Sequence, residues 1–217
     1  MASDDDLLAL SEPIRARFVA RHDAREVGLA DSRDAIRSAA NAIRAIHRDE
    51  RDRADELIAE ARRSLASAIE ACAPHPTVRH AGFISDAAKE VAEAILTRAA
   101  VTGGAIEGPE AIGVDDVAWL HGLAETVGEL RRAALDRVRR GDLDEAERML
   151  ALMQEILSAL TTIDVPDGLT RGLRRATDSA RAITERTRGD LTTAAGQRDL
   201  VRALEAHRAA LDEVSGR

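Results

Sequence analysis

The feature that most restricts the fold of this chain is a repeated spacing of three or four residues between small apolar side chains. In residues 50–72 the apolar positions are Ala54, Leu57, Ile58, Ala61, Leu65, Ala68 and Ile69. This spacing places apolar side chains along one face of a helix. No segment shows the alternation of period two that marks a half-buried strand. The sequence therefore predicts an all-α protein.

The composition supports this prediction and describes the expected core. Hydrophobic residues make up 45% of the 217 residues, whereas aromatic residues make up only 1%. A core of Ala, Leu, Ile and Val suits close helix packing and is poor material for a β-sandwich. The length suffices to bury a substantial core.

Turn residues divide the chain into successive helices. We expect Asp31 or Ser32 to cap one helix start, because their side chains accept hydrogen bonds from free backbone N–H groups. The last segment is expected to form one or two helices with a hinge near Gly189 or Gly196. The expected helices cover residues 3–29, 32–46, 50–72, 79–101, 114–140, 142–163 and 169–214. The predicted architecture is a bundle of six or seven antiparallel helices in a single domain, 1–217, with 1–30 as a less ordered N-terminal helix.

Charge and motif content exclude several classes of function. The net charge of −8 argues against a protein coated in nucleic acid, although it leaves room for a local basic patch. The single cysteine, Cys72, forms no internal disulfide, and zinc-ligand spacings, a P-loop, a GxGxxG motif and a serine-hydrolase motif are absent from the sequence. No apolar run approaches the roughly 20 residues of a membrane helix. With an acidic, not signal-like, beginning, we expect a soluble, cytoplasmic protein.

Acidic residues recur at helical spacing on two neighbouring segments. Asp86, Glu90 and Glu93 share one face, and Glu125 and Glu129 are four residues apart. Like charges at such spacings destabilise an isolated helix by about 0.2–0.5 kcal/mol. These faces are either solvated, as in any chain with 32% charged residues, or they bind a hard cation such as Mg²⁺ or Mn²⁺. Periodicity alone leaves both interpretations open.

Basic residues flank the first of these acidic segments. Arg79 and His80 precede it and Arg98 lies near its end, and arginine can hold a phosphate through two hydrogen bonds. A loop rich in His and Arg is more often simply solvated. Phe83 and Trp119 lie on apolar stripes, so they are expected in the core and not as platforms for base stacking.

Three segments, taken together, resemble the translin family, which comprises translin, translin-associated factor X and microbial relatives. They are IRSAANAIRAIHRDE, GFISDAAKEVAEAILT and WLHGLAETVGELRRAALDRVRRGDLDEAERML, in the order of the family. The resemblance extends from about Ser32 to about Thr193. It implies an α-superhelical, translin-like fold and a closed octamer that encloses single-stranded RNA or DNA. In the translin-associated factor X type, interior carboxylates bind Mg²⁺ and the protein cleaves single-stranded RNA.

The resemblance also assigns roles to individual residues. Glu90 and Glu93 match the two glutamates three residues apart on a family helix. Glu125 stands where the nuclease subunit has an aspartate, and Glu129 matches the glutamate of the GEL motif.

From this correspondence we expect a Mg²⁺- or Mn²⁺-dependent endoribonuclease in a homo-oligomeric shell. Its expected catalytic and metal-binding residues are Glu90, Glu93 and Glu125, with Glu129 as a fourth ligand or as support for the others. Phosphate contacts are expected from Arg79, His80 and Arg98. The alternatives are a translin-like protein that binds single-stranded nucleic acid without cutting it, and an all-α assembly protein with no nucleic-acid role.

Overall fold

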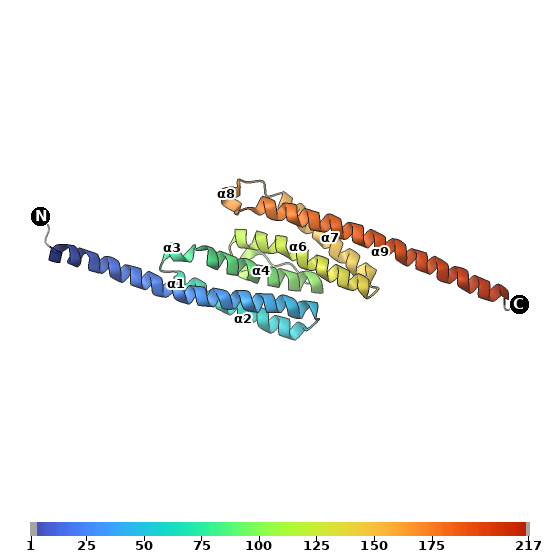
Figure 1. Cartoon of the computed structure of the whole chain (residues 1–217), viewed down its shortest axis with the longest axis horizontal. Helices are drawn as coiled ribbons and strands as arrows, with labels where there is room; N and C mark the ends of the chain where they lie inside the picture. Colours follow the sequence, from blue (N-terminus) through green and yellow to red (C-terminus); the bar gives the residue numbers. More distant parts are fainter. Residues whose placement is uncertain (1–3, 216–217) are drawn as a thin grey trace. The chain divides into compact units, whose positions relative to one another are not determined.

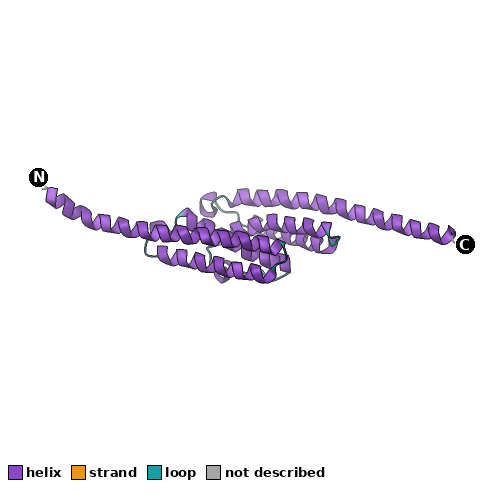
Figure 2. Ribbon diagram, turned by 60° about the horizontal axis from the view of Figure 1, so that its bottom comes forward, coloured by secondary structure: helices purple, strands orange, loops and turns teal. Residues whose placement is uncertain are grey.

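Every regular element in the described part of the chain, residues 4–215 of this computed structural model, is a helix (Figures 1 and 2), which confirms the all-α prediction. Three of the helices are single turns, so six long helices carry the fold of these residues. The bounds are α1 Asp4–His47, α2 Arg51–Cys72, α3 Pro76–Arg79, α4 Gly82–Thr102, α5 Pro109–Ile112, α6 Asp116–Arg139, α7 Leu143–Thr161, α8 Asp167–Thr170 and α9 Leu173–Ser215.

Two of the expected helix boundaries are wrong. The helix α1 continues through the expected cap, because the Asp31 carboxylate instead accepts a hydrogen bond from Ser67 of α2 at 2.6 Å, and Ser32 is buried. The helix α9 is likewise continuous through Gly189 and Gly196. A glycine inside a helix costs about 1 kcal/mol relative to alanine, which does not end a helix of 43 residues.

The chain divides into two compact units. The first comprises the chain up to Ala99 together with Ala105–Gly122, and the second comprises Ala100–Gly104 together with the chain from Leu123 onward. That the chain forms a single domain stays a prediction. No helix within residues 4–215 is long and apolar enough to cross a membrane.

In the first unit, α1 and α2 form an antiparallel hairpin (Figure 1). Small side chains let the two helices approach closely, and they form the core on both sides. The buried positions include Ala35, Ala39, Ala42 and Ile46 on α1, and Ala54, Leu57, Ala61, Leu65 and Ala68 on α2. Arg98 of α4 adds a polar link to α2, because its guanidinium donates two hydrogen bonds to Asp55, at 2.8 and 3.0 Å.

A second cluster closes the other end of this hairpin. Cys72, Val78 and Ile84 are buried together, and Phe83 packs against them. The thiol of Cys72 donates a weak hydrogen bond to the carbonyl of Ala24 at 3.5 Å, and burial raises the pKa of this thiol. The helix α2 thus ends at Cys72, as expected from the range 50–72, and the turn that follows, with Pro74 and Pro76, packs against α1.

In the second unit, α7 packs along α9. Asp142 caps α7 by accepting a hydrogen bond from the Glu145 backbone N–H at 3.2 Å. Arg148 pairs with Glu145 at 2.7 Å and donates to the carbonyl of Ala100 at 3.1 Å, where the end of α4 leaves carbonyls without helical partners. This guanidinium lowers the pKa of the Glu145 carboxyl group.

Gly28 of α1 offers a test of this packing. A methyl group at this position overlaps the sulfur of Cys72, so Gly28→Ala is expected to lower the free energy of unfolding by about 1–3 kcal/mol. Cys72→Ala in the same chain is expected to restore part of the loss. Urea unfolding measures the effect, with Gly189→Ala as the control, because open space surrounds that α9 position. Equal stability of Gly28→Ala and wild type would contradict this packing.

Candidate functional site

The candidate site depends on a close approach of α6 to α4 at Gly122. A β-carbon at this position would lie 2.8 Å from the β-carbon of Ala92, 2.9 Å from the backbone nitrogen of Glu93 and 3.0 Å from the carbonyl oxygen of Lys89. Two of these three neighbours are backbone atoms, which cannot rotate aside. Glycine is therefore required for the observed separation of the helices, and this separation sets how far a side chain must reach from one helix to the other.

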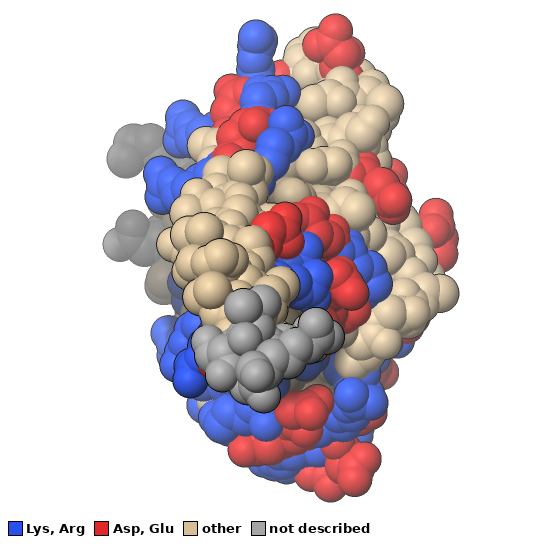
Figure 3. Space-filling model, turned by 90° about the vertical axis from the view of Figure 1, so that its right-hand side faces the viewer, with Lys and Arg blue, Asp and Glu red and all other residues tan. Residues whose placement is uncertain are grey.

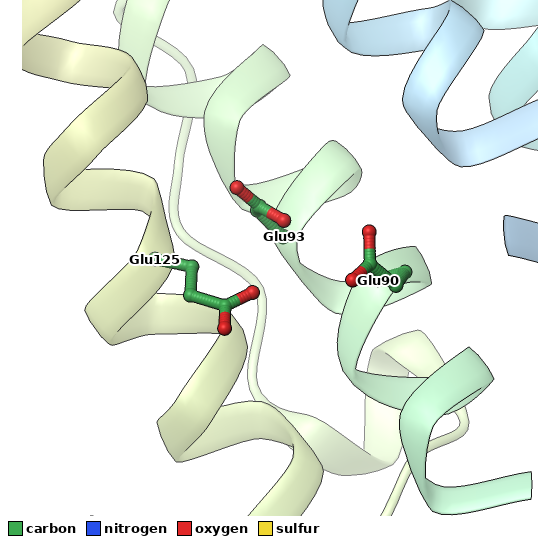
Figure 4. A group of neighbouring side chains, drawn as sticks. All are labelled: Glu90, Glu93 and Glu125. Carbon is green, nitrogen blue, oxygen red and sulfur yellow. The ribbon is translucent and has the colours of Figure 1, made fainter. Parts of the chain in front are cut away.

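Three glutamates converge next to this contact. Glu90 and Glu93 lie three residues apart on α4, and Glu125 follows Gly122 by three residues on α6. One carboxylate oxygen from each lies within 4.8 Å of the other two. Figure 4 shows Glu125 extending from α6 toward α4, which carries the other two side chains. The predicted set of Glu90, Glu93 and Glu125 is therefore brought together.

The surroundings of the three glutamates are only partly solvated. Glu93 is 9% exposed and the Glu90 side chain 27%. The ammonium of Lys89 lies 3.1 Å from one oxygen of Glu90 and offsets part of the negative charge. Partial burial strengthens the mutual repulsion of the carboxylates, because water screens them less than on an open surface. A bound cation relieves this repulsion.

The donor set suits a hard divalent cation. Mg²⁺ and Mn²⁺ prefer carboxylate oxygens, and Mg²⁺ keeps several water molecules when one or two carboxylates bind it. Three glutamates therefore form a donor set of the kind that such an ion accepts. These residues fit such an ion in ligand type, number and spacing.

The other two acids of the sequence pattern lie outside this group. Asp86 is exposed, and Glu129 has a carboxylate oxygen 4.0 Å from the guanidinium of Arg132. Helical periodicity put five acids on related faces, but the group within 4.8 Å contains three of them. The role of Glu129 as a fourth ligand or support stays a prediction.

The three residues expected to contact phosphate lie at two places in the first unit. Arg79 is the last residue of α3 and is half-buried, and His80 follows it and is exposed. Arg98 makes the two hydrogen bonds to Asp55 described above. Their contact with nucleic acid stays a prediction.

Sequence reasoning missed two residues that shape the site, Lys89 and Gly122. Lys89 is the only lysine among 31 lysine and arginine residues. A lysine so rare in the chain, directly before Glu90, could have indicated a residue of the site. Gly122 stands between the apolar positions Leu120 and Leu123, where a glycine inside a helix often marks a close backbone approach.

The surface drawn in Figure 3 shows acidic and basic side chains interspersed. With a net charge of −8, the chain as a whole does not attract a polyanion. Any affinity for one must come from particular groups on the surface and not from the field of the whole chain.

Comparison with known proteins gives relatives that cover most of the chain. No family model matches. An uncharacterised protein of Methanocaldococcus jannaschii is 28% identical over 179 residues, which cover 81% of this chain and 79% of that protein.

Solved structures match more closely. The sequence of AfC3PO is 33% identical to this one. The match covers 86% of this chain and 97% of AfC3PO, and the two structures superimpose with a TM-score of 0.80. AfC3PO in complex with duplex RNA gives the same identity and coverage with a TM-score of 0.79. Apo-NeC3PO shares the fold at 18% identity, with a TM-score of 0.77 and coverage of 89% of this chain and 98% of that one.

The contact at Gly122 provides a test of the site geometry. Gly122→Ala is expected to lower the free energy of unfolding by about 1–3 kcal/mol, because backbone atoms of α4 block the added methyl group. Gly128→Ala on the same helix is the matched control, because nothing lies within 4 Å of the added carbon. The control is expected to raise stability by up to about 1 kcal/mol through helix propensity. Equal effects of the two changes, measured by urea unfolding, would argue against the close approach.

Proposed function

Because the chain belongs to the family of AfC3PO, the translin-family C3PO proteins, we propose that it binds RNA and cleaves it with a metal ion held by Glu90, Glu93 and Glu125. The observation that carries the catalytic part is the convergence of three carboxylates from α4 and α6 within 4.8 Å. The RNA-binding part is supported by the structure of the relative AfC3PO with duplex RNA.

The three glutamates hold the ion, for which Mg²⁺ and Mn²⁺ are the proposed candidates. When bound, such an ion would act as a Lewis acid and stabilise the charge that develops on the scissile phosphate. Glu90 and Glu93 supply their oxygens from one face of α4, and Glu125 reaches across from α6. Lys89 fixes one oxygen of Glu90 at 3.1 Å and so limits the rotamers of that side chain. A glutamate at position 125 reaches one methylene further than an aspartate, and its carboxylate lies within 4.8 Å of the other two.

The proposed substrate is single-stranded RNA, with single-stranded DNA as a further ligand. Arg79, His80 and Arg98 are proposed to contact its phosphates, because guanidinium and imidazole groups donate hydrogen bonds to phosphate oxygens. At Arg98 a phosphate would replace the Asp55 carboxylate, which accepts two hydrogen bonds from this guanidinium.

A homo-oligomer, an octamer by family resemblance, is proposed as the active form. Large apolar side chains lie exposed near both ends of the described chain, and a second copy is able to cover them. On α1 these are Leu7, Leu8, Leu10, Ile14, Phe18, Val19 and Val27, and on α9 they are Leu200, Val201, Leu204 and Leu211.

A second candidate function is the binding of nucleic acid without cleavage. The observation that favours it is the ammonium of Lys89 at 3.1 Å from Glu90, which already supplies one positive charge to the acidic group. In this case the fold holds the nucleic acid and the glutamates need no ion.

Cleavage of a labelled single-stranded RNA separates the two functions. We expect product with Mn²⁺ or Mg²⁺ and none with EDTA. Glu125→Gln is expected to lower the rate by roughly 100-fold or more, because it removes a charged ligand from the ion. Glu147→Gln on α7 is the control, since this exposed glutamate lies outside the group.

The same experiment decides between the outcomes. Unchanged cleavage by Glu125→Gln would remove this residue from the metal site. RNA binding that falls steeply with salt, with no product from the wild type in Mn²⁺, would establish the non-catalytic function. The same assay with a duplex RNA measures whether the protein prefers single-stranded or double-stranded RNA.

A further inference from the structure

A small hollow lies at the turn between α1 and α2, within the first unit. Its volume is about 190 Å³, and three arginines line it. Arg44 belongs to the last turn of α1, Arg48 to the turn that follows, and Arg53 to the first turn of α2. Asn41 and Leu57 complete the lining. Three guanidinium groups therefore face one small space in a chain whose net charge is −8.

Carboxylates neutralise this group only in part. Arg48 donates to Glu50 at 2.6 and 2.8 Å, and Arg53 donates to Glu56 at 2.8 Å. The Arg44 guanidinium donates to the amide oxygen of Asn41 at 2.6 Å and makes no ion pair within residues 4–215. Glu50 and Glu60 also lie near enough to Arg53 to stabilise its charge, so Arg44 is the arginine of the hollow whose hydrogen-bond partner is not a carboxylate. Both pairs are exposed, so water weakens them and an incoming anion can displace them.

Helix electrostatics explain only part of this arrangement. Arg44 lies in the last turn of α1, where the helix dipole favours a positive charge. Arg53 lies in the first turn of α2, where the same dipole disfavours it. Nearby acids and not the helix end therefore stabilise Arg53: Glu56 accepts its hydrogen bond, and Glu60 and Glu50 add to this effect.

The chemistry of the lining identifies the anion. Guanidinium groups match the oxygens of a phosphate through paired hydrogen bonds. The hollow accommodates one phosphate group, and its apolar wall is the aliphatic Leu57, which offers no aromatic face for stacking a base. We propose that this arginine hollow binds one backbone phosphate of the RNA. The inference rests on the proposed RNA binding and adds Arg44, Arg48 and Arg53 to its phosphate contacts.

Fluorescence anisotropy of a labelled RNA over a range of salt concentrations tests the hollow. Arg44→Gln is the most direct variant, because it leaves no carboxylate without its partner. We expect about tenfold weaker binding for Arg44→Gln and for Arg53→Gln, and a salt slope smaller by about 0.7–1 for each. Arg188→Gln is the matched control, since this exposed arginine pairs with Glu185 three residues away, as Arg53 does with Glu56. Circular dichroism confirms that each variant is folded.

The outcomes separate this proposal from the proposed function. If the wild type binds RNA and both variants keep its affinity and its salt slope, the proposal that the hollow binds phosphate is overturned. The proposed function then still stands. Absence of RNA binding by wild type overturns the function, and a titration with inorganic phosphate followed by ³¹P NMR then tests the hollow alone. Phosphate binding that Arg44→Gln abolishes supports it as an anion site, and absence of phosphate binding overturns it. An effect of Arg44→Gln confined to RNA with a 5′-phosphate overturns the backbone assignment in favour of a terminal phosphate.

Discussion

The candidate site depends on one steric constraint, the absence of a side chain at Gly122. The backbone of α6 comes so close to Lys89, Ala92 and Glu93 of α4 that even a methyl group has no room. Glu125 follows this contact by less than one helical turn, so its carboxylate meets those of Glu90 and Glu93. The contact at Gly122 therefore contributes both to the packing of the two helices and to the spacing of the three carboxylates.

Much of the fold is readable from local sequence because helix ends are local events. The expected helix ends at 101 and 140 lie within one residue of the observed ends, and the expected start at 142 is the N-cap of α7. The expected break near Asp31 is absent, since the Asp31 carboxylate bonds to Ser67 of α2, 36 residues away. A capping residue and a residue with a distant partner look the same in sequence. Tertiary contacts decide such cases, and periodicity contains no information about them.

The same limit applies to the candidate site. Periodicity identified the acidic faces, and family resemblance selected Glu90, Glu93 and Glu125 from them. Neither gave the 4.8 Å spacing, which follows from the crossing of α4 and α6. Lys89 beside Glu90 and the arginine hollow at the α1–α2 turn also depend on side-chain placement. Arg48 and Arg53 are each explained by a nearby acid in the sequence, and only the fold brings them to one space with Arg44.

The three glutamates and the arginine hollow have opposite electrostatic effects on a nucleic acid. An RNA strand brings negative charge to three half-buried glutamates, which repel it until a cation is bound. Under the proposed RNA binding, the arginine hollow attracts the same strand without any ion. Under the proposed function, metal and RNA therefore bind with positive coupling at the glutamates, and each raises the affinity of the other by the same factor, as linkage requires. The hollow contributes affinity that is independent of the metal, so removing the ion weakens the hold on the strand near the glutamates and leaves the phosphate contacts at the α1–α2 turn intact.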